Sequence, residues 1–125
     1  MVKSIIYTVI AVALCLAFFI FSEMYVEEQF EDFHAAVLTL YNKVESGYAN
    51  DGDVRAVCAM WEEKKSRLHV FIPHNDISQI DYYLTEAGGF IREQRYDHAL
   101  AKLEAVSHMA QSLPSSYSIN LENVF

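Results

Sequence analysis

Residues 4–46 read SIIYTVIAVALCLAFFIFSEMYVEEQFEDFHAAVLTLYNKVES, and this stretch decides the fold because neither Gly nor Pro interrupts it. Its first 19 residues, Ser4 to Ser22, carry no charge. The remainder places apolar residues at alternating steps of four and three, which is the pattern of a helix with one buried face. These stripe residues are Val26, Phe30, Phe33, Val37, Leu40 and Val44. The stretch therefore predicts one long helix, apolar all round in its first half and on one side in its second.

The charge-free half has the dimensions of a membrane anchor. At about 1.5 Å per residue it spans about 28 Å, close to the roughly 30 Å hydrocarbon core of a bilayer. Eleven of its side chains are Ile, Val, Leu or Phe. Together they favour insertion by about 3 to 7 kcal/mol, an upper figure because it applies only near the membrane centre. We expect residues 1–22 to form a short cytoplasmic stub and a transmembrane helix.

A cleaved signal peptide is the main alternative for this segment. Such peptides have a shorter apolar run that ends in a small-x-small cleavage site. Here the small residues Ala11, Ala13 and Ala17 lie inside the run, and the bulky segment Phe18–Phe21 follows them. This order favours an uncleaved signal anchor.

The flanking charges predict the orientation in the cell membrane. Lys3 precedes the anchor, whereas the first basic residue after it is Lys43. Because basic residues near a membrane span are retained in the cytoplasm, the N-terminus should be cytoplasmic and the C-terminal domain extracytoplasmic.

The residues after Ser22 form one acidic domain. They carry 17 acidic and 8 basic residues, a formal charge of −9. Such a surface repels phosphate backbones, so we expect no nucleic-acid partner. The expected partners are the bilayer, through the N-terminal helix, and another membrane or envelope protein. A homodimer is an open alternative, because the stripe that begins at Val26 could pair in a parallel coiled coil.

Breaker and capping residues divide this domain into helices. Gly47 should end the first helix, and Asp51 or Asp53 should cap a second that runs to Pro73. Asn75 or Asp76 should cap a third, with Asp76 and Gln79 spaced as a capping box. A fourth should run from about Asp97 and stop before Pro114. The predicted fold is all-α, with the N-terminal transmembrane helix continuing into an antiparallel bundle of about four helices, two stacked hairpins, over residues 23–113.

Two features of this domain leave alternatives open. Gly88 and Gly89 fall inside the third helix, where they mark either a local bend or a close approach by a neighbouring helix. The tail, residues 114–125, is semi-apolar near its end, and we expect it to dock on the bundle. Its apolar residues are Ile119, Leu121, Val124 and Phe125.

One group of motifs resembles a known family. The motifs are Trp61-Glu62-Glu63-Lys64, Leu68, Phe71-Ile72-Pro73-His74-Asn75-Asp76-Ile77, Ile80-Asp81 and the ending Leu121-Glu122-Asn123-Val124-Phe125. They resemble domain-of-unknown-function family 4363 over essentially the whole chain. The resemblance implies a small membrane-anchored helical protein of an anaerobic Gram-positive bacterium, and it brings no catalytic residues with it.

The candidate site is an interaction or structural motif at the second helix corner. Its residues are Trp61, Phe71, Ile72, Pro73, His74, Asn75 and Asp76. One interpretation is a helix stop and restart, and the other is an anion or metal site that uses His74 and Asp76 at a helix N-terminus. The five histidines form no paired-ligand pattern, and no nucleophile elbow is present. We expect no cofactor and a non-catalytic protein-interaction module at the outer membrane face. A metal- or anion-binding sensor or enzyme centred on His74 is the alternative.

Overall fold

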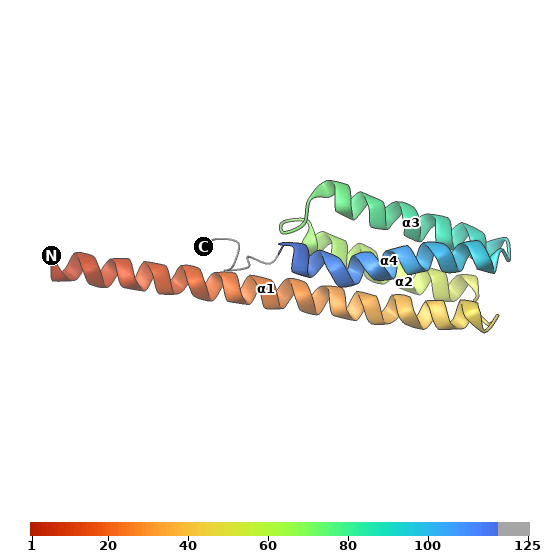
Figure 1. The fold of residues 1–125 in the computed structure, drawn as a ribbon, viewed down its shortest axis with the longest axis horizontal. Coiled ribbons are helices and arrows are strands. Elements are labelled where there is room, and N and C mark those ends of the chain that lie inside the picture. The colour runs from red at the N-terminus through yellow and green to blue at the C-terminus, as the bar shows by residue number, and fades with distance from the viewer. Residues whose placement is uncertain (118–125) are drawn as a thin grey trace.

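The computed structural model describes residues 1–117, which form four helices and no strand. They are α1 (Val2–Glu45), α2 (Asp51–Leu68), α3 (His74–Arg92) and α4 (Tyr96–Tyr117). Successive helices run antiparallel as two hairpins, and these pack through α1 against α4 and through α2 against α3 (Figure 1). The prediction of an all-α bundle whose first helix extends well beyond it is confirmed. The apolar tail residues after Tyr117 lie outside the described residues.

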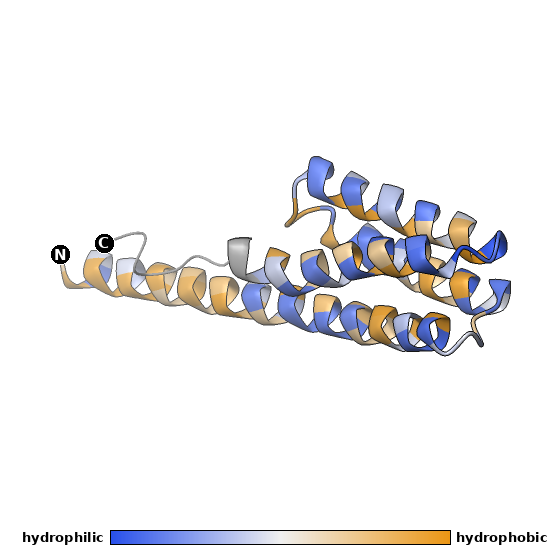
Figure 2. Ribbon diagram, turned by 45° about the vertical axis from the view of Figure 1, so that its right-hand side comes forward, coloured by the Kyte–Doolittle hydropathy of each residue, from blue (hydrophilic) through white to orange (hydrophobic). Residues whose placement is uncertain are grey.

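The helix α1 has two unlike halves, as its sequence predicts. Every residue from Met1 to Phe21 is exposed, and the ribbon there is coloured as hydrophobic over most of its length, with short polar patches near the N-terminus (Figure 2). From Val26 onward the helix buries one face, and all six predicted stripe residues are buried. Of the helices in residues 1–117, α1 is the one that is long and apolar enough to cross a membrane.

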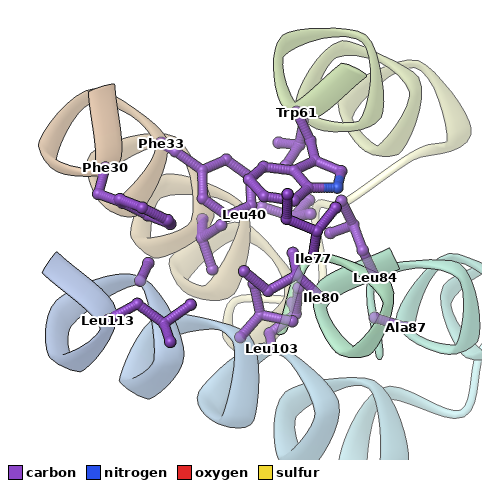
Figure 3. Packing of buried hydrophobic residues seen from close by; sticks show 14 of the residues in the cluster. Phe30, Phe33, Leu40, Trp61, Ile77, Ile80, Leu84, Ala87, Leu103 and Leu113 are labelled. Atoms are coloured by element: carbon purple, nitrogen blue, oxygen red, sulfur yellow. The ribbon is translucent and has the colours of Figure 1, made fainter. Parts of the chain in front are cut away.

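The core lies between the second half of α1 and the three other helices (Figure 3). Its largest side chain is Trp61 of α2, which is 1 % exposed. The Trp61 ring packs on Phe33 of α1, with their centroids 4.8 Å apart. Each helix contributes a stripe, so the bundle is closed by apolar faces that no single helix could bury alone.

The turn between α1 and α2 has the predicted glycine but a different cap. Gly47 has φ +78°, the left-handed conformation that ends a helix. The N-cap of α2 is Asn50, so the prediction of Asp51 or Asp53 was wrong. Asn50 Oδ1 accepts from the Asp53 N–H at 2.9 Å, and Asp53 Oδ2 accepts from the Asn50 N–H at 3.1 Å. Asp53 is thus the second member of a capping box, because Asn50 lies three residues earlier in an extended conformation.

The corner between α2 and α3 also differs from the prediction. The helix α2 ends at Leu68, not at Pro73. The turn that follows is held by hydrogen bonds from the backbone N–H groups of Phe71 and Ile72 to the Leu68 carbonyl. Ile72 at the end of this turn is buried in the core. Pro73 itself is the N-cap of α3, so neither Asn75 nor Asp76 caps that helix.

The fourth helix passes through its proline. We expected α4 to stop before Pro114, but it continues to Tyr117. A proline inside a helix loses one backbone hydrogen bond to the residue four positions earlier, here Ala110. Ala110 and Leu113 are both buried in the core, and this packing holds the chain helical where the proline weakens it.

The two glycines of α3 have different surroundings. A Cβ atom added at Gly88 would lie 3.0 Å from Cγ1 of Val54 on α2, whereas one at Gly89 would meet no atom within 4 Å. The helix runs unbroken through both residues. Close approach of a neighbouring helix therefore explains Gly88, and Gly89 has no such role.

Candidate functional site: the base of the bundle

Trp61, the first residue of the predicted site, is buried between helices and helps to hold them together. Its indole Nε1–H donates to Asp81 Oδ1 of α3 at 2.6 Å. Lys65, one turn further along α2, lies 3.4 Å from the same carboxylate and 2.9 Å from Glu62. The Glu62 and Asp81 carboxylates raise the pKa of the Lys65 ammonium. The hydrogen bond between Trp61 and Asp81 thus links α2 to α3. Because Trp61 is almost fully buried, a binding partner could not contact it.

The predicted corner residues divide into buried and exposed groups. Ile72 is 3 % exposed and Pro73 starts α3, so these two residues fix the corner. Phe71, His74 and Asn75 are exposed. The His74 Nε2 atom lies 3.3 Å from Ser78 Oγ, one turn along α3. Asp76 lies in the first turn of α3, where a carboxylate interacts favourably with the helix dipole.

Phe71 is the corner residue that reaches α1. Its ring lies 6.2 Å from the Tyr25 ring, which in turn lies 6.3 Å from the ring of Phe21 in the apolar half. Trp61 faces Phe33 instead, eight residues or about 12 Å further along α1. The structure therefore separates Trp61 from the corner, and it brings the corner to the place where α1 leaves the bundle.

A groove of about 720 Å³ opens at this end of the bundle, which we name the base groove. It runs between α1, the α2–α3 loop and the last turns of α4. Its lining residues are Phe18, Phe19, Ser22, Glu23, Val26, Glu27, Phe30, Glu31, His34, Phe71, Ile72, Ala110, Gln111 and Pro114. Aromatic and aliphatic side chains supply most of this surface, and carboxylates of α1 add negative charge.

The acidic residues of the base groove follow helical spacing. Glu27 and Glu31 are exposed, lie one turn apart, and have no ion-pair partner among residues 1–117. Two like charges four residues apart destabilise a helix by about 0.2 to 0.5 kcal/mol. The repeat of Glu at positions 23, 27 and 31 was the available signal for an acidic groove.

The chemistry available to a metal or a nucleophile is dispersed. Within residues 1–117, no three His, Cys, Asp or Glu side chains gather as metal ligands. His34 lies 3.0 Å from Ser107 of α4, and His98 packs on the Phe90 ring. Burial raises the pKa of the Cys58 thiol, which disfavours the reactive thiolate.

Comparison with known proteins gives one match. The model of a domain of unknown function (DUF4363) matches residues 20–124. The match begins inside the apolar half of α1 and takes in the whole bundle. Comparisons with curated proteins and with solved structures gave no match.

Proposed function

The chain belongs to the DUF4363 family, and from that premise we propose that it is a non-catalytic, membrane-anchored interaction module. The bundle binds a helix of another membrane protein in the base groove. The observation that carries this proposal is the groove itself, an apolar and acidic surface at the point where α1 leaves the bundle.

The first part of the proposal is that the apolar half of α1 spans the cell membrane. Its side chains are exposed over the length that a bilayer requires, and water would oppose that exposure. The N-terminus lies in the cytoplasm with Lys3, and the bundle stands on the outer side. The base groove then faces the membrane surface.

The composition of the groove defines the partner. Phe18 and Phe19 belong to the membrane half of α1, whereas Glu27 and Glu31 lie just beyond it. A complementary helix is therefore apolar within the membrane and carries Lys or Arg one to three turns outside it. Ion pairs with that helix would relieve the repulsion between the two glutamates, and the apolar floor would exclude water from them.

A second copy of this chain fits the groove less well. A two-fold interface through the base groove would place the same glutamates opposite each other. Lys64 of α2, which lies 3.3 Å from Asp32 of α1, is 9 % exposed and already paired. The acidic groove thus favours a different protein over a homodimer.

The alternative of a metal- or anion-binding site at His74 has less support. His74 is exposed and its described contact is the hydroxyl of Ser78. A stable helical metal site needs several converging ligands, and the described residues gather no group of three or more His, Cys, Asp or Glu side chains at His74.

Charge reversal in the groove tests the proposal. The full-length chain with Glu27→Lys and Glu31→Lys is expressed in its own cells and recovered in mild detergent, and its bound proteins are identified. The matched control carries Glu28→Lys and Glu45→Lys, which make the same charge change on the exposed surface of α1 outside the groove.

We expect the parent and the control to recover the same membrane protein, and the groove variant to recover at least tenfold less. Reversing the basic residue of the partner should restore binding to the groove variant. The proposal is wrong if both variants retain the partner equally, or if the parent recovers no specific protein.

A further inference from the structure

We propose that the tip of the α2–α3 loop, Val70 and Phe71, lies in the headgroup region of the bilayer that α1 spans. The bundle would then touch the membrane at two points, the helix and the loop. This inference rests on the membrane anchoring proposed above and does not depend on the partner helix.

The first observation is the exposure of apolar side chains at the loop tip. Val70 is 84 % exposed and Phe71 is 36 % exposed. His69 before them is exposed as well, and this exposed segment lies between two buried residues, Leu68 at 0 % and Ile72 at 3 %. Leu68 and Ile72 close the core, so Val70 and Phe71 point away from it. Turns in water favour small and polar residues, and two neighbouring apolar side chains at a tip call for a different solvent.

The second observation is the height of the loop along α1. Tyr25, whose ring contacts Phe71, lies three residues beyond Ser22, the last residue of the charge-free segment. Three residues advance a helix by about 4.5 Å. The headgroup region on each side of a bilayer is about 5 to 7 Å thick, so Phe71 lies at its level when α1 stands near the membrane normal.

The third observation is the continuity of the aromatic side chains. Phe21, Tyr25 and Phe71 form a chain of ring contacts from the apolar half of α1 to the loop. Aromatic side chains concentrate at the membrane–water interface. The loop lies at the same end of the bundle as the exit of α1, while the α1–α2 turn lies at the opposite end (Figure 1).

A second contact point has a mechanical consequence. A single helix can tilt in the bilayer and so raise or lower the bundle, whereas an embedded loop opposes the tilt that would withdraw it from the headgroups. The base groove, which Phe71 also lines, would then be held at a fixed height above the membrane.

Spin labels on the full-length chain in phosphatidylcholine vesicles test this inference. In a background with Cys15→Ala and Cys58→Ala, single cysteines replace Leu14, Val70 or Tyr48 and are labelled. Tyr48 is the matched control, because it is 81 % exposed in the turn at the far end of the bundle. Each label is measured for collisions with oxygen, which concentrates in lipid, and with a water-soluble nickel complex. Circular dichroism checks that each variant keeps its helical content.

We expect the label at 14 to favour oxygen strongly, the label at 70 to show at least threefold less nickel accessibility than that at 48, and the label at 48 to behave as in water. If 14 is lipid-exposed while 70 matches 48, the loop does not enter the interface and the inference is wrong. If both 70 and 48 are shielded, the protection is not specific to the loop, and the inference is also wrong. If 14 is accessible to nickel, the anchoring proposal itself fails, and the loop inference fails with it.

Discussion

The two halves of α1 form one continuous helix, but the first half is exposed on every side and the second half packs against the bundle. Residues 2–21 are exposed on every side, whereas residues 26–45 bury seven side chains against the bundle. Neither half contains Gly or Pro, so helix propensity does not distinguish them. The two halves differ in how their apolar residues are distributed around the helix axis. An apolar surface all round suits lipid, while a single stripe suits the faces of other helices.

The difference teaches that a core position and an anchor position of the same residue type should respond differently to mutation. A side chain of the second half has protein neighbours only when the bundle is folded. A side chain of the first half that lies outside the base groove, such as Phe21, should keep its exposure and its contact with Tyr25 of the same helix when the bundle unfolds. Pairs of like residues, one from each half, test this difference.

The largest expected effect is on the stability of the bundle. Phe33 is 0 % exposed, so Phe33→Ala should lower the free energy of unfolding by about 3 to 5 kcal/mol. Phe21 is 67 % exposed on the same helix, and Phe21→Ala should change that free energy by less than about 0.5 kcal/mol. Urea unfolding of the full chain in micelles, followed by circular dichroism, measures both. Equal losses would show that the first half also belongs to the folding unit.

The next effect is on membrane insertion. Leu14→Arg places a charge near the middle of the apolar half, which should oppose insertion by about 3 kcal/mol, or more than a hundredfold in partition. Leu38→Arg makes the same change on the exposed side of the second half, and it should leave insertion unchanged. Resistance to alkaline extraction from membranes reports the difference. Full retention of the Leu14 variant would argue against an anchor in lipid.

The two glycines of α3 show the same contrast with a smaller expected effect, because Gly88 packs against α2 and Gly89 faces open space. Gly89→Ala should raise the free energy of unfolding by about 1 kcal/mol, because alanine favours the helix and meets no atom. Gly88→Ala should fall short of that gain, since its Cβ would lie 3.0 Å from Val54. A Val54→Ala background should remove the shortfall. Equal effects of the two alanines in the parent would show that α2 does not limit the space at Gly88.

The smallest expected effect concerns acid stability at the far end of the second half. There Lys43 of α1 donates to Asp53 of α2 at 2.8 Å. The Lys43 ammonium and the Asn50 N–H hold the pKa of the Asp53 carboxyl below its usual 3.8. A lowered folded pKa contributes stability above pH 3.8, and this contribution is lost as the pH falls below that value.

Asp53→Asn should therefore reduce the drop in melting temperature between pH 7 and pH 3. Asp97→Asn, at an exposed carboxylate with no ion pair among residues 1–117, serves as the control. An unchanged acid-induced drop in the Asp53 variant would mean that this ion pair does not secure the end of α1.

Much of the fold follows from patterns that lie within single helices. The stripe from Val26 to Val44 faces the core as its spacing predicts, and Gly47 ends α1. Helix caps were harder, because Asn50, Asp51 and Asp53 are all good capping residues and only the path of the turn selects Asn50. The end of α4 was mispredicted for a similar reason. Pro114 predicts a helix end, and only the tertiary packing of Ala110 and Leu113 keeps the chain helical beyond it.

The base groove could not be predicted because its walls come from distant segments. Glu27, Phe71 and Gln111 are far apart in the chain, and nothing in their local sequence brings them together. The predicted interaction site at the corner stays a prediction; of its residues, Phe71 and Ile72 line the base groove, and Phe71 contacts Tyr25 of α1. Trp61, grouped with the corner by its motif, lies in the core instead.

The sequence by itself determined where helices form, which faces are apolar, and that the first helix has one half suited to lipid. These properties depend on residue type and on spacing along a single helix. The tertiary structure decided which loop meets the exit of α1, which glycine must remain small, and where apolar and acidic surfaces join into a groove. Those outcomes depend on distances between helices, and such distances are set only when all four stripes pack together.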